Sequence, residues 1–256
     1  MSDATSANAS SDAYRAETPW GPTAALAVAL LASLAPVLVG IAGLMAETSG
    51  LISPEGQTQL DGAPSLASPF MLAQMILGQL LSLSIIWLAA GWRGARVQTL
   101  RLASPQTGWV EAAGLGVLLI VAIGPIELLL YRIAGLDLFT DGRWLLEGLR
   151  SPIWLGIVVA AVILAPLWEE ITFRGFLLSA LAKSSLGFWP AAVLSSSLWT
   201  LLHWGYSWPG LSSVFLAGIG LSWIMQRTGS MRAVVVAHGV VNAFSLTVTY
   251  LFAPQP

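Results

Sequence analysis

Long apolar stretches recur along the chain, separated by short polar segments. A bilayer span needs roughly 20 predominantly apolar residues. Seven stretches reach or approach that length: 22–46, 70–91, 109–131, 152–182, 188–204, 209–226 and 233–253. The fifth and sixth are short, and the fourth is so long that part of it must tilt, kink or leave the bilayer. The pattern predicts an all-α, polytopic bundle of about seven transmembrane helices.

The rest of the chain divides around these spans. Residues 1–19 are rich in Ser, Ala and Asp and have no apolar face, which predicts a disordered tail. The tail lacks the basic first region of a signal peptide. We expect residues 20–151 to form a first group of membrane helices. Residues 152–253 form a second group, which alone carries the polar residues described below.

Composition supports a membrane protein. Of 256 residues 56% are hydrophobic and 9% are charged, whereas a soluble domain carries about 25% charged residues. The 12 Trp residues are typical of a protein with two membrane–water interfaces. A net charge of -2 without a basic cluster predicts no binding to nucleic acid. Since the chain has no cysteine, disulfides, thiolate catalysis and cysteine metal sites are excluded.

The distribution of Lys and Arg predicts the orientation, because cytoplasmic loops carry an excess of them. If the N-terminus is inside, the inner segments hold Arg15, Arg93, Arg96, Arg101, Arg174, Lys183, Arg227 and Arg232. The outer loops then hold only Arg132, Arg143 and Arg150. We therefore expect a multi-pass protein of the plasma membrane with its N-terminus in the cytoplasm. An odd number of spans places the C-terminus outside.

Three stretches of the second group carry polar side chains inside apolar segments. They are 166–174, which contains Glu-Glu-x-x-x-Arg; 199–203, which reads Trp-x-x-x-His; and 238–242, which reads His-x-x-x-Asn. Both histidines of the chain lie here. Ionisable groups in a membrane are costly and normally face a cavity or one another. These stretches are the candidate functional site.

Helix geometry separates the two adjacent glutamates. Glu170 and Arg174 are four residues apart and can pair on one face. Glu169 points about 100° away and must find a partner on another helix. Pro166 removes a backbone hydrogen bond, which could kink the helix and admit water. A purely structural Glu–Arg pair, with the Arg174 side chain reaching the inner surface, remains an alternative.

The histidines and the asparagine supply the other groups that amide hydrolysis needs. His238 and Asn242 share one face of the last helix and could donate hydrogen bonds to an oxyanion. A carboxylate with His203 could deprotonate a water. Taken singly, each has a simpler explanation: His238 and Asn242 as hydrogen bonds between helices, and His203 as a packed core residue. Together with Glu169 they make a complete set for peptide-bond cleavage.

In this order and spacing the three motifs resemble the CPBP family, the CAAX-protease and bacteriocin-processing (Abi) group that includes the type II CAAX prenyl endopeptidases. The flanking residues agree, with Gly175 after the first motif and Arg227-Thr-Gly-Ser before the last helix. The resemblance covers about 152–250, and the first three spans match only in being hydrophobic. It implies an intramembrane endopeptidase acting on membrane-associated proteins or peptides.

The resemblance also implies a role for each matching residue. One pair activates the water and the other forms the oxyanion hole: Glu169 with His203, and His238 with Asn242. Glu170 and Arg174 match the supporting members of the first motif. The second motif usually begins with Phe, and here Trp199 takes that place, so we expect Trp199 to shape the substrate channel.

A metal-free site is favoured over a zinc site. Zinc could be held by two histidines and a glutamate, which would be Glu169, His203 and His238. The chain lacks a His-Glu-x-x-His motif, and using both histidines as ligands leaves only Asn242 as an oxyanion donor. We therefore expect no cofactor, with zinc as the alternative.

Depths estimated from the predicted helix ends agree only in part. At 1.5 Å per residue, Glu169 and His203 both lie roughly 21–22 Å from the inner surface. His238 lies roughly 9 Å and Asn242 roughly 15 Å from it. Either the last helix starts deeper than its neighbours, or the predicted boundaries are wrong by one turn.

Two other functions compete with a protease. One is a non-catalytic membrane protein of the bacteriocin-immunity or scaffold type that keeps the motifs for folding. The other is a transporter in which Glu169, His203 and His238 relay protons. Carriers more often show paired repeats with broken helices in both halves, whereas here the polar residues lie in one half. The oligomeric state is not indicated by the sequence.

Overall fold

The computed structural model describes residue 14 and residues 16–51, 68–103 and 106–254, and these form helices and turns without a strand. In chain order the elements are α1 (Pro22–Thr48), α2 (Pro69–Trp92), α3 (Arg96–Thr99), α4 (Trp109–Ala134), η1 (Arg143–Leu145), α5 (Leu146–Leu149), α6 (Trp154–Val159), η2 (Ala160–Leu164), α7 (Ala165–Glu170), η3 (Ile171–Leu177), α8 (Leu178–Ala182), α9 (Phe188–Leu201), α10 (Trp208–Thr228) and α11 (Met231–Phe252). The predicted all-α fold is confirmed.

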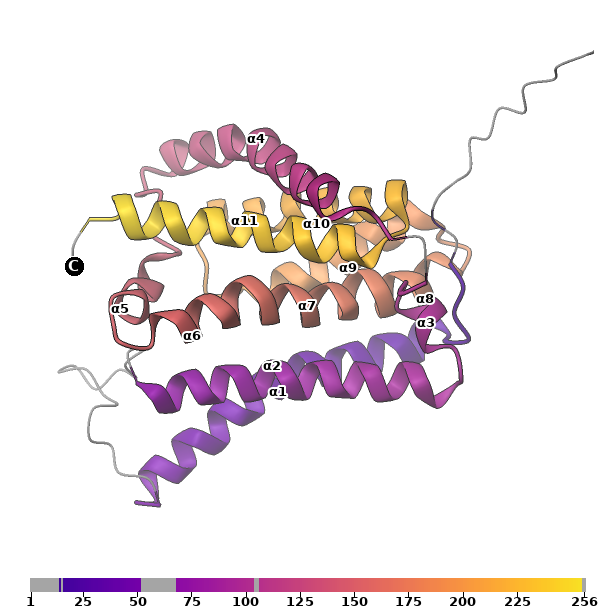
Figure 1. Cartoon of the computed structure of the whole chain (residues 1–256), viewed down its shortest axis with the longest axis horizontal. Helices are drawn as coiled ribbons and strands as arrows, with labels where there is room; N and C mark the ends of the chain where they lie inside the picture. Colours follow the sequence, from indigo (N-terminus) through magenta and orange to yellow (C-terminus); the bar gives the residue numbers. More distant parts are fainter. Residues whose placement is uncertain (1–13, 15, 52–67, 104–105, 255–256) are drawn as a thin grey trace, which may run out of the picture.

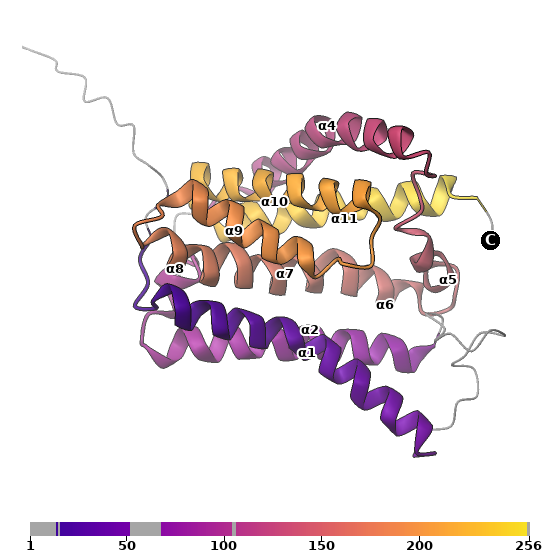
Figure 2. The ribbon, with the colours of Figure 1, turned by 180° about the vertical axis from the view of Figure 1, so that it is seen from behind.

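The long helix over Trp154–Ala182, built from α6, η2, α7, η3 and α8, lies in the middle of the bundle. The pair α1 and α2 packs on one side of it, and α4, α10 and α11 lie on the other (Figure 1). Seen from behind, α9 lies beside α10 (Figure 2). Because it is covered from several sides, this central helix can bury polar side chains that a peripheral helix would turn toward lipid.

Six helices of the described residues are long and apolar enough to cross a membrane. The fifth predicted span fails this test, since α9 has only 14 residues, or roughly 21 Å, against a hydrocarbon core of about 30 Å. The chain nevertheless runs the length of the bundle here, because α9 starts next to α8 and α10 starts near the opposite end (Figure 2). The protein is an integral, multi-pass membrane protein.

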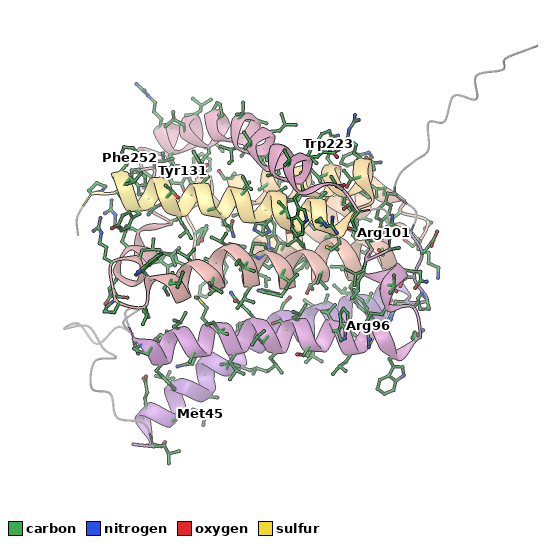
Figure 3. The ribbon with its side chains drawn as sticks, viewed as in Figure 1. Met45, Arg96, Arg101, Tyr131, Trp223 and Phe252 are labelled. Atoms are coloured by element: carbon green, nitrogen blue, oxygen red, sulfur yellow. The ribbon has the colours of Figure 1, made fainter. Side chains whose placement is uncertain are left out.

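Two of the arginines predicted to be cytoplasmic lie at one end of the bundle, whereas Arg174 is buried between helices. Arg96 and Arg101 lie there with Trp223, while Tyr131 and Phe252 lie at the opposite end (Figure 3). Arg96 stacks over Trp87 with its guanidinium carbon 4.5 Å from the ring centre. We call this the basic end, and the other the C-terminal end.

Part of the predicted tail packs against the basic end. Tyr14 is buried and its hydroxyl donates to Ser179 Oγ over 3.1 Å. Thr18 accepts a hydrogen bond from Thr99, and its carbonyl accepts one from Lys183 over 2.7 Å. Residues 1–13 and 15, which make up most of the predicted tail, lie outside the described residues.

The central helix is distorted on both sides of its two glutamates. The segments η2 and η3 are π-helical, and α7 between them carries Glu169 and Glu170. Ala165 N–H donates to Ala160 O rather than to Ala161 O, and Pro166 has no N–H to offer the next carbonyl. Where Pro166 predicted a kink, the helix instead contains a π-helical turn. This turn holds about one more residue than an α-helical turn and so changes the direction in which the following side chains point.

Helix α1 bends away from α2 in its second half (Figure 1), and Pro36 lies inside it. The two helices touch where Gly78 faces Pro36: a Cβ on Gly78 would come within 2.7 Å of Pro36 Cα. Ser82 adds a polar contact, since its hydroxyl donates to Ala32 O over 2.8 Å. These contacts hold α1 and α2 together before α1 diverges from α2 in its second half.

We predict that Gly78→Leu lowers the free energy of unfolding by about 1–3 kcal/mol, because the added side chain forces α1 and α2 apart. Gly114→Leu is the matched control, since nothing lies within 4 Å of a Cβ on Gly114. Thermal unfolding of both purified variants in detergent measures the difference. Equal midpoints for Gly78→Leu and wild type would contradict the close packing described for this pair.

Candidate active site

Glu170 is the centre of the buried polar residues and is fully inaccessible to solvent. Its Oε1 accepts a hydrogen bond from Arg174 Nη1 over 2.9 Å, within the pair predicted from their spacing. The same oxygen lies 2.8 Å from His238 Nδ1. Both partners are themselves buried, Arg174 completely and His238 to 4% exposure. One carboxylate oxygen therefore joins the central helix to α11.

The Arg174 guanidinium is enclosed by three helices. Its carbon lies 4.4 Å from the centre of the Trp199 ring of α9, which supplies a cation–π contact. On α10, Gly218 leaves room for it: a Cβ there would lie 3.0 Å from Arg174 Nη2 and 2.9 Å from Ser196 Cβ. Since the charge is paired and stacked, Arg174 does not reach the membrane surface as its alternative interpretation required.

Glu169 finds its partner on α9, as its position on the helix requires. Trp199 Nε1 donates to Glu169 Oε2 over 2.6 Å. His238 Nε2 lies 4.0 Å from the same oxygen, which is too long for a hydrogen bond. Because His238 Nδ1 is engaged by Glu170, Nε2 is the ring nitrogen that remains available on the Glu169 side. The Glu169 side chain is 13% exposed, so it borders the solvent-accessible space that Glu170 does not reach.

His203 lies beyond the end of α9, in the turn 202–207, and not within a span as predicted. Its ring contacts Trp199 edge to face at 5.3 Å between centroids, and Tyr206 at the same distance. Trp199 contacts His238 in the same way at 5.4 Å. The two histidines therefore flank the indole that holds Glu169.

Tyr206 belongs to this group although no motif in the sequence singles it out. Burial, followed by the negative charges of Glu169 and Asp141, raises the pKa of Tyr206 to about 12. Its phenol therefore stays protonated at physiological pH and remains a hydrogen-bond donor. The side chain of Trp144 forms a hydrogen bond with it, which links the turn to the segment before α5.

Asp141 fixes the turn that carries His203 and Tyr206. Its Oδ1 accepts from Ser207 N–H over 2.8 Å, and its Oδ2 accepts from the Ser207 hydroxyl over 2.6 Å and from the Tyr131 hydroxyl. Ser207 in turn caps α10, since its hydroxyl accepts from Gly210 N–H. Carboxylates are favourable near helix N-termini. The signal available in the sequence was Ser207-Trp-Pro209, a typical helix start that ends the preceding span.

Asn242 is anchored to the distorted helix. Its Nδ2 donates to Ala161 O over 2.9 Å. This is the carbonyl left without its ordinary donor by the π-turn and by Pro166. One of the two amide N–H groups of Asn242 is thus used to satisfy the backbone, and one remains. The alternative interpretation of Asn242, a hydrogen bond between helices, is thus observed, and its role as an oxyanion donor stays a prediction.

Of the two explanations for the unequal depths estimated from the sequence, the structure supports a last helix that starts deeper than its neighbours. Glu170 and His238 are bonded directly, so the two residues lie at one level. Helix α11 starts inward of the point where α8 ends (Figure 1). The polar segment before α4 lies over its start, where Ser230 Oγ donates to Gln106 Oε1 over 2.8 Å.

Within the described residues, no three His, Asp or Glu side chains are grouped so that they could share a metal ion. The triad considered for zinc is divided by Trp199, whose ring lies against both His203 and His238. The arrangement does not fit a zinc site, so no step of the chemistry below is derived through a metal.

Glu169 borders a cleft of about 320 Å³ between the central helix and the α1–α2 pair. Trp168, Trp144 and Ile157 line it on one side, and α1 and α2 supply the rest of its wall. The site is therefore bounded by both groups of helices, although the chemistry-bearing residues all come from the second.

Comparison with known proteins identifies the second group of helices. Residues 150–244 match the family described as type II CAAX prenyl endopeptidase Rce1-like. The chain is 30% identical over 90 residues to UPF0177 protein YxdF of Lactococcus lactis, and 36% identical over 58 residues to UPF0177 protein YajF of the same organism. These alignments span 35% and 23% of this chain, and 45% and 27% of the relatives. No solved structure matches the chain. The family match confirms the resemblance inferred from the three motifs, all of which lie within it.

We predict that Arg174→Met lowers the free energy of unfolding by about 3–5 kcal/mol, because it leaves the Glu170 carboxylate buried and unpaired. Arg143→Met serves as a control, since Arg143 pairs with Asp137 over 3.5 Å with both side chains about two-fifths exposed. We expect that control to cost less than about 1 kcal/mol. Unfolding in detergent, followed by tryptophan fluorescence, measures both. Similar losses in the two variants would refute the central role of the buried pair.

A double-mutant cycle tests the anchoring of Asn242. Asn242→Ala alone should cost about 1–3 kcal/mol of stability by leaving Ala161 O unpaired. In a Pro166→Ala background the new backbone N–H can serve the carbonyls of this turn, so the same substitution should cost less. Unfolding free energies of the four proteins give the coupling. If the two losses add within about 0.5 kcal/mol, Asn242 does not compensate for Pro166.

Proposed function

Since residues 150–244 are Rce1-like and lie in the core of a multi-pass membrane protein, we propose that this protein is an intramembrane endopeptidase that hydrolyses peptide bonds of membrane-associated proteins or peptides. One observation carries the proposal. Of the two motif glutamates, Glu170 is neutralised by Arg174 and sealed off, while Glu169 borders the cleft and has no cationic partner on its own helix. The acid that hydrolysis needs is the one the fold leaves accessible.

Glu169 is the proposed general base. Trp199 N–H holds its Oε2 in place, and a carboxylate so oriented can take a proton from a water that attacks the substrate carbonyl carbon. His203 is the proposed partner of Glu169 in this activation, and its ring lies in the turn 202–207 against Trp199, the indole that donates to Glu169. The proton then passes to the leaving amine nitrogen as the C–N bond breaks, which returns Glu169 to its starting state.

His238 is the proposed oxyanion donor. In this proposed role Nδ1 donates to the Glu170 carboxylate, and Nε2, on the Glu169 side, carries the hydrogen that the oxyanion accepts. A donor preorganised in a site of low dielectric is worth more than one in water. The remaining N–H of Asn242 is the second proposed donor, and the Ala161 carbonyl fixes its orientation.

Several features of the setting belong to the same proposal. The basic end faces the cytoplasm of a plasma-membrane protein, as the excess of Lys and Arg there favours. The reaction uses no metal, and Trp199 also shapes the wall beside the scissile bond. A non-catalytic scaffold is the competing function, because the bonds among Glu170, Arg174 and His238 would stabilise the fold without any catalysis.

Cleavage of fluorogenic peptides, some of them lipid-modified, by the purified protein tests the proposal. We expect Glu169→Gln to lower the rate at least about 100-fold, the minimum usual for loss of a general base. His203→Ala should also lose activity, and a strong chelator should leave the wild-type rate unchanged. Because a glutamine oxygen can accept the same hydrogen bond from Trp199, the variant should unfold near the wild-type temperature.

Glu111→Gln is the matched control, since Glu111 lies exposed in the first turn of α4 and should keep full activity. Cleavage that survives Glu169→Gln would refute the proposed base. Loss of activity with chelator and its return with zinc would overturn the metal-free mechanism. If cells that carry Glu169→Gln keep the biological function of the wild-type protein, the non-catalytic scaffold would be favoured.

A further inference from the structure

The cleft beside Glu169 is built largely from helices outside the Rce1-like region. Pro36 and Gly40 of α1 line it, together with Met71, Leu72 and Met75 of α2. The splayed second half of α1 thus forms one wall (Figure 1). A hollow of the same volume on α2, lined by Leu83, Ser84, Trp87 and Leu88, carries no acid or base. The cleft is the hollow that joins an apolar wall to the proposed base.

One polar group in this wall lacks a partner. Gln79 lines the cleft and is only 9% exposed. Its side-chain carbonyl oxygen, Oε1, is buried and accepts no hydrogen bond from any described residue. An unpaired buried carbonyl destabilises a protein unless another group supplies the donor. Nearby Gln74 differs, since its amide packs against Gly43 of α1. Gln74 also lines the cleft, so Gln79 is the glutamine of this wall whose buried carbonyl oxygen lacks a donor among the described residues.

The lining sets the chemistry of an occupant. It must present apolar surface to the Met and Leu side chains, and a hydrogen-bond donor to Gln79. It must also bring a carbonyl to Glu169. Methionine side chains adapt to varied apolar shapes and so favour a range of side chains over a single one. An extended peptide with apolar residues meets all three requirements, because its backbone alternates N–H and C=O groups.

Resting on the proposed function, we propose that this cleft binds an extended apolar stretch of the peptide substrate, with Gln79 accepting a hydrogen bond from a substrate backbone N–H. The volume of about 320 Å³ is at the lower end for ligand pockets, which suits a few residues and excludes a folded domain. Substrate selection then lies in α1 and α2, while the Rce1-like region supplies the chemistry. The cleft lies toward the C-terminal end, since it uses the second half of α1 and the first half of α2.

Binding of a defined probe tests this without relying on turnover. The probe is a nine-residue peptide of Leu, Val and Ala with blocked ends and one central p-benzoylphenylalanine, added to the full chain in detergent with Glu169→Gln to prevent cleavage. A second probe of the same sequence is N-methylated at every backbone nitrogen and has end blocks without an N–H, so that it offers no backbone donor. Photo-crosslinking sites and affinities are measured for both.

We expect crosslinks on the walls formed by α1 and α2, near Met71 and Met75. The N-methylated probe should bind about 3- to 10-fold more weakly than the parent, the usual worth of one hydrogen bond. Gln79→Leu should bind the parent probe more weakly by a similar factor and should no longer distinguish the two probes. Gln79→Leu should also unfold at or above the wild-type temperature, because it removes an unpaired buried polar atom.

Gln98→Leu is the matched control, since Gln98 is exposed on α3 and should bind both probes as the parent chain does. Crosslinks away from the cleft, or discrimination between probes that persists in Gln79→Leu, would overturn the proposal. Its failure is separable from that of the protease. Glu169-dependent cleavage with an unchanged KM in Gln79→Leu would refute the cleft alone. Probe binding as described, with no cleavage that depends on Glu169, would refute the protease alone.

Discussion

The buried bond between Glu170 and Arg174 is the constraint on which the rest of the site depends. A charge in a membrane interior is costly unless it is paired, and here Glu170 contacts both Arg174 and His238 while the Trp199 ring stacks on the guanidinium. Each of these partners comes from a different helix. The pair therefore fixes the central helix, α9 and α11 relative to one another before any substrate binds.

The two adjacent glutamates, Glu169 and Glu170, have different surroundings in this arrangement. Neighbours on a helix point about 100° apart, so one glutamate can face the helix contacts and the other the cleft. Glu170 is paired with Arg174 inside the bundle, whereas Glu169 borders the cleft. The two π-turns that flank them adjust where each side chain points, and Asn242 satisfies the backbone carbonyl that this distortion exposes.

Much of this could be predicted from local pattern. Apolar runs located the six long helices, and spacing by four predicted the Glu170–Arg174 pair. The resemblance to a family followed from three short motifs in order. Contacts across the bundle could not be predicted in this way. That Trp199 holds Glu169, or that Asn242 serves Ala161, depends on how distant helices pack, and Pro166 alone does not decide between a kink and a π-turn.

The end of α9 was misplaced for a different reason. Residues 202–204 extend the hydrophobic run, whereas the helix start at Ser207 requires a turn before it. The cleft was beyond any local pattern, because its walls are residues separated by more than 100 positions in the chain. The sequence thus indicated the motif residues but not the cleft that Glu169 borders.

The short α9 has a consequence for the surrounding lipid. A helix of 14 residues cannot match the acyl layer, and Trp204 in the turn after it is 83% exposed, as an indole at a headgroup boundary would be. Lipids beside α9 must thin or tilt to meet that boundary, which draws the headgroup layer inward. A bilayer thinned in this way brings the headgroup layer closer to the turn that carries His203.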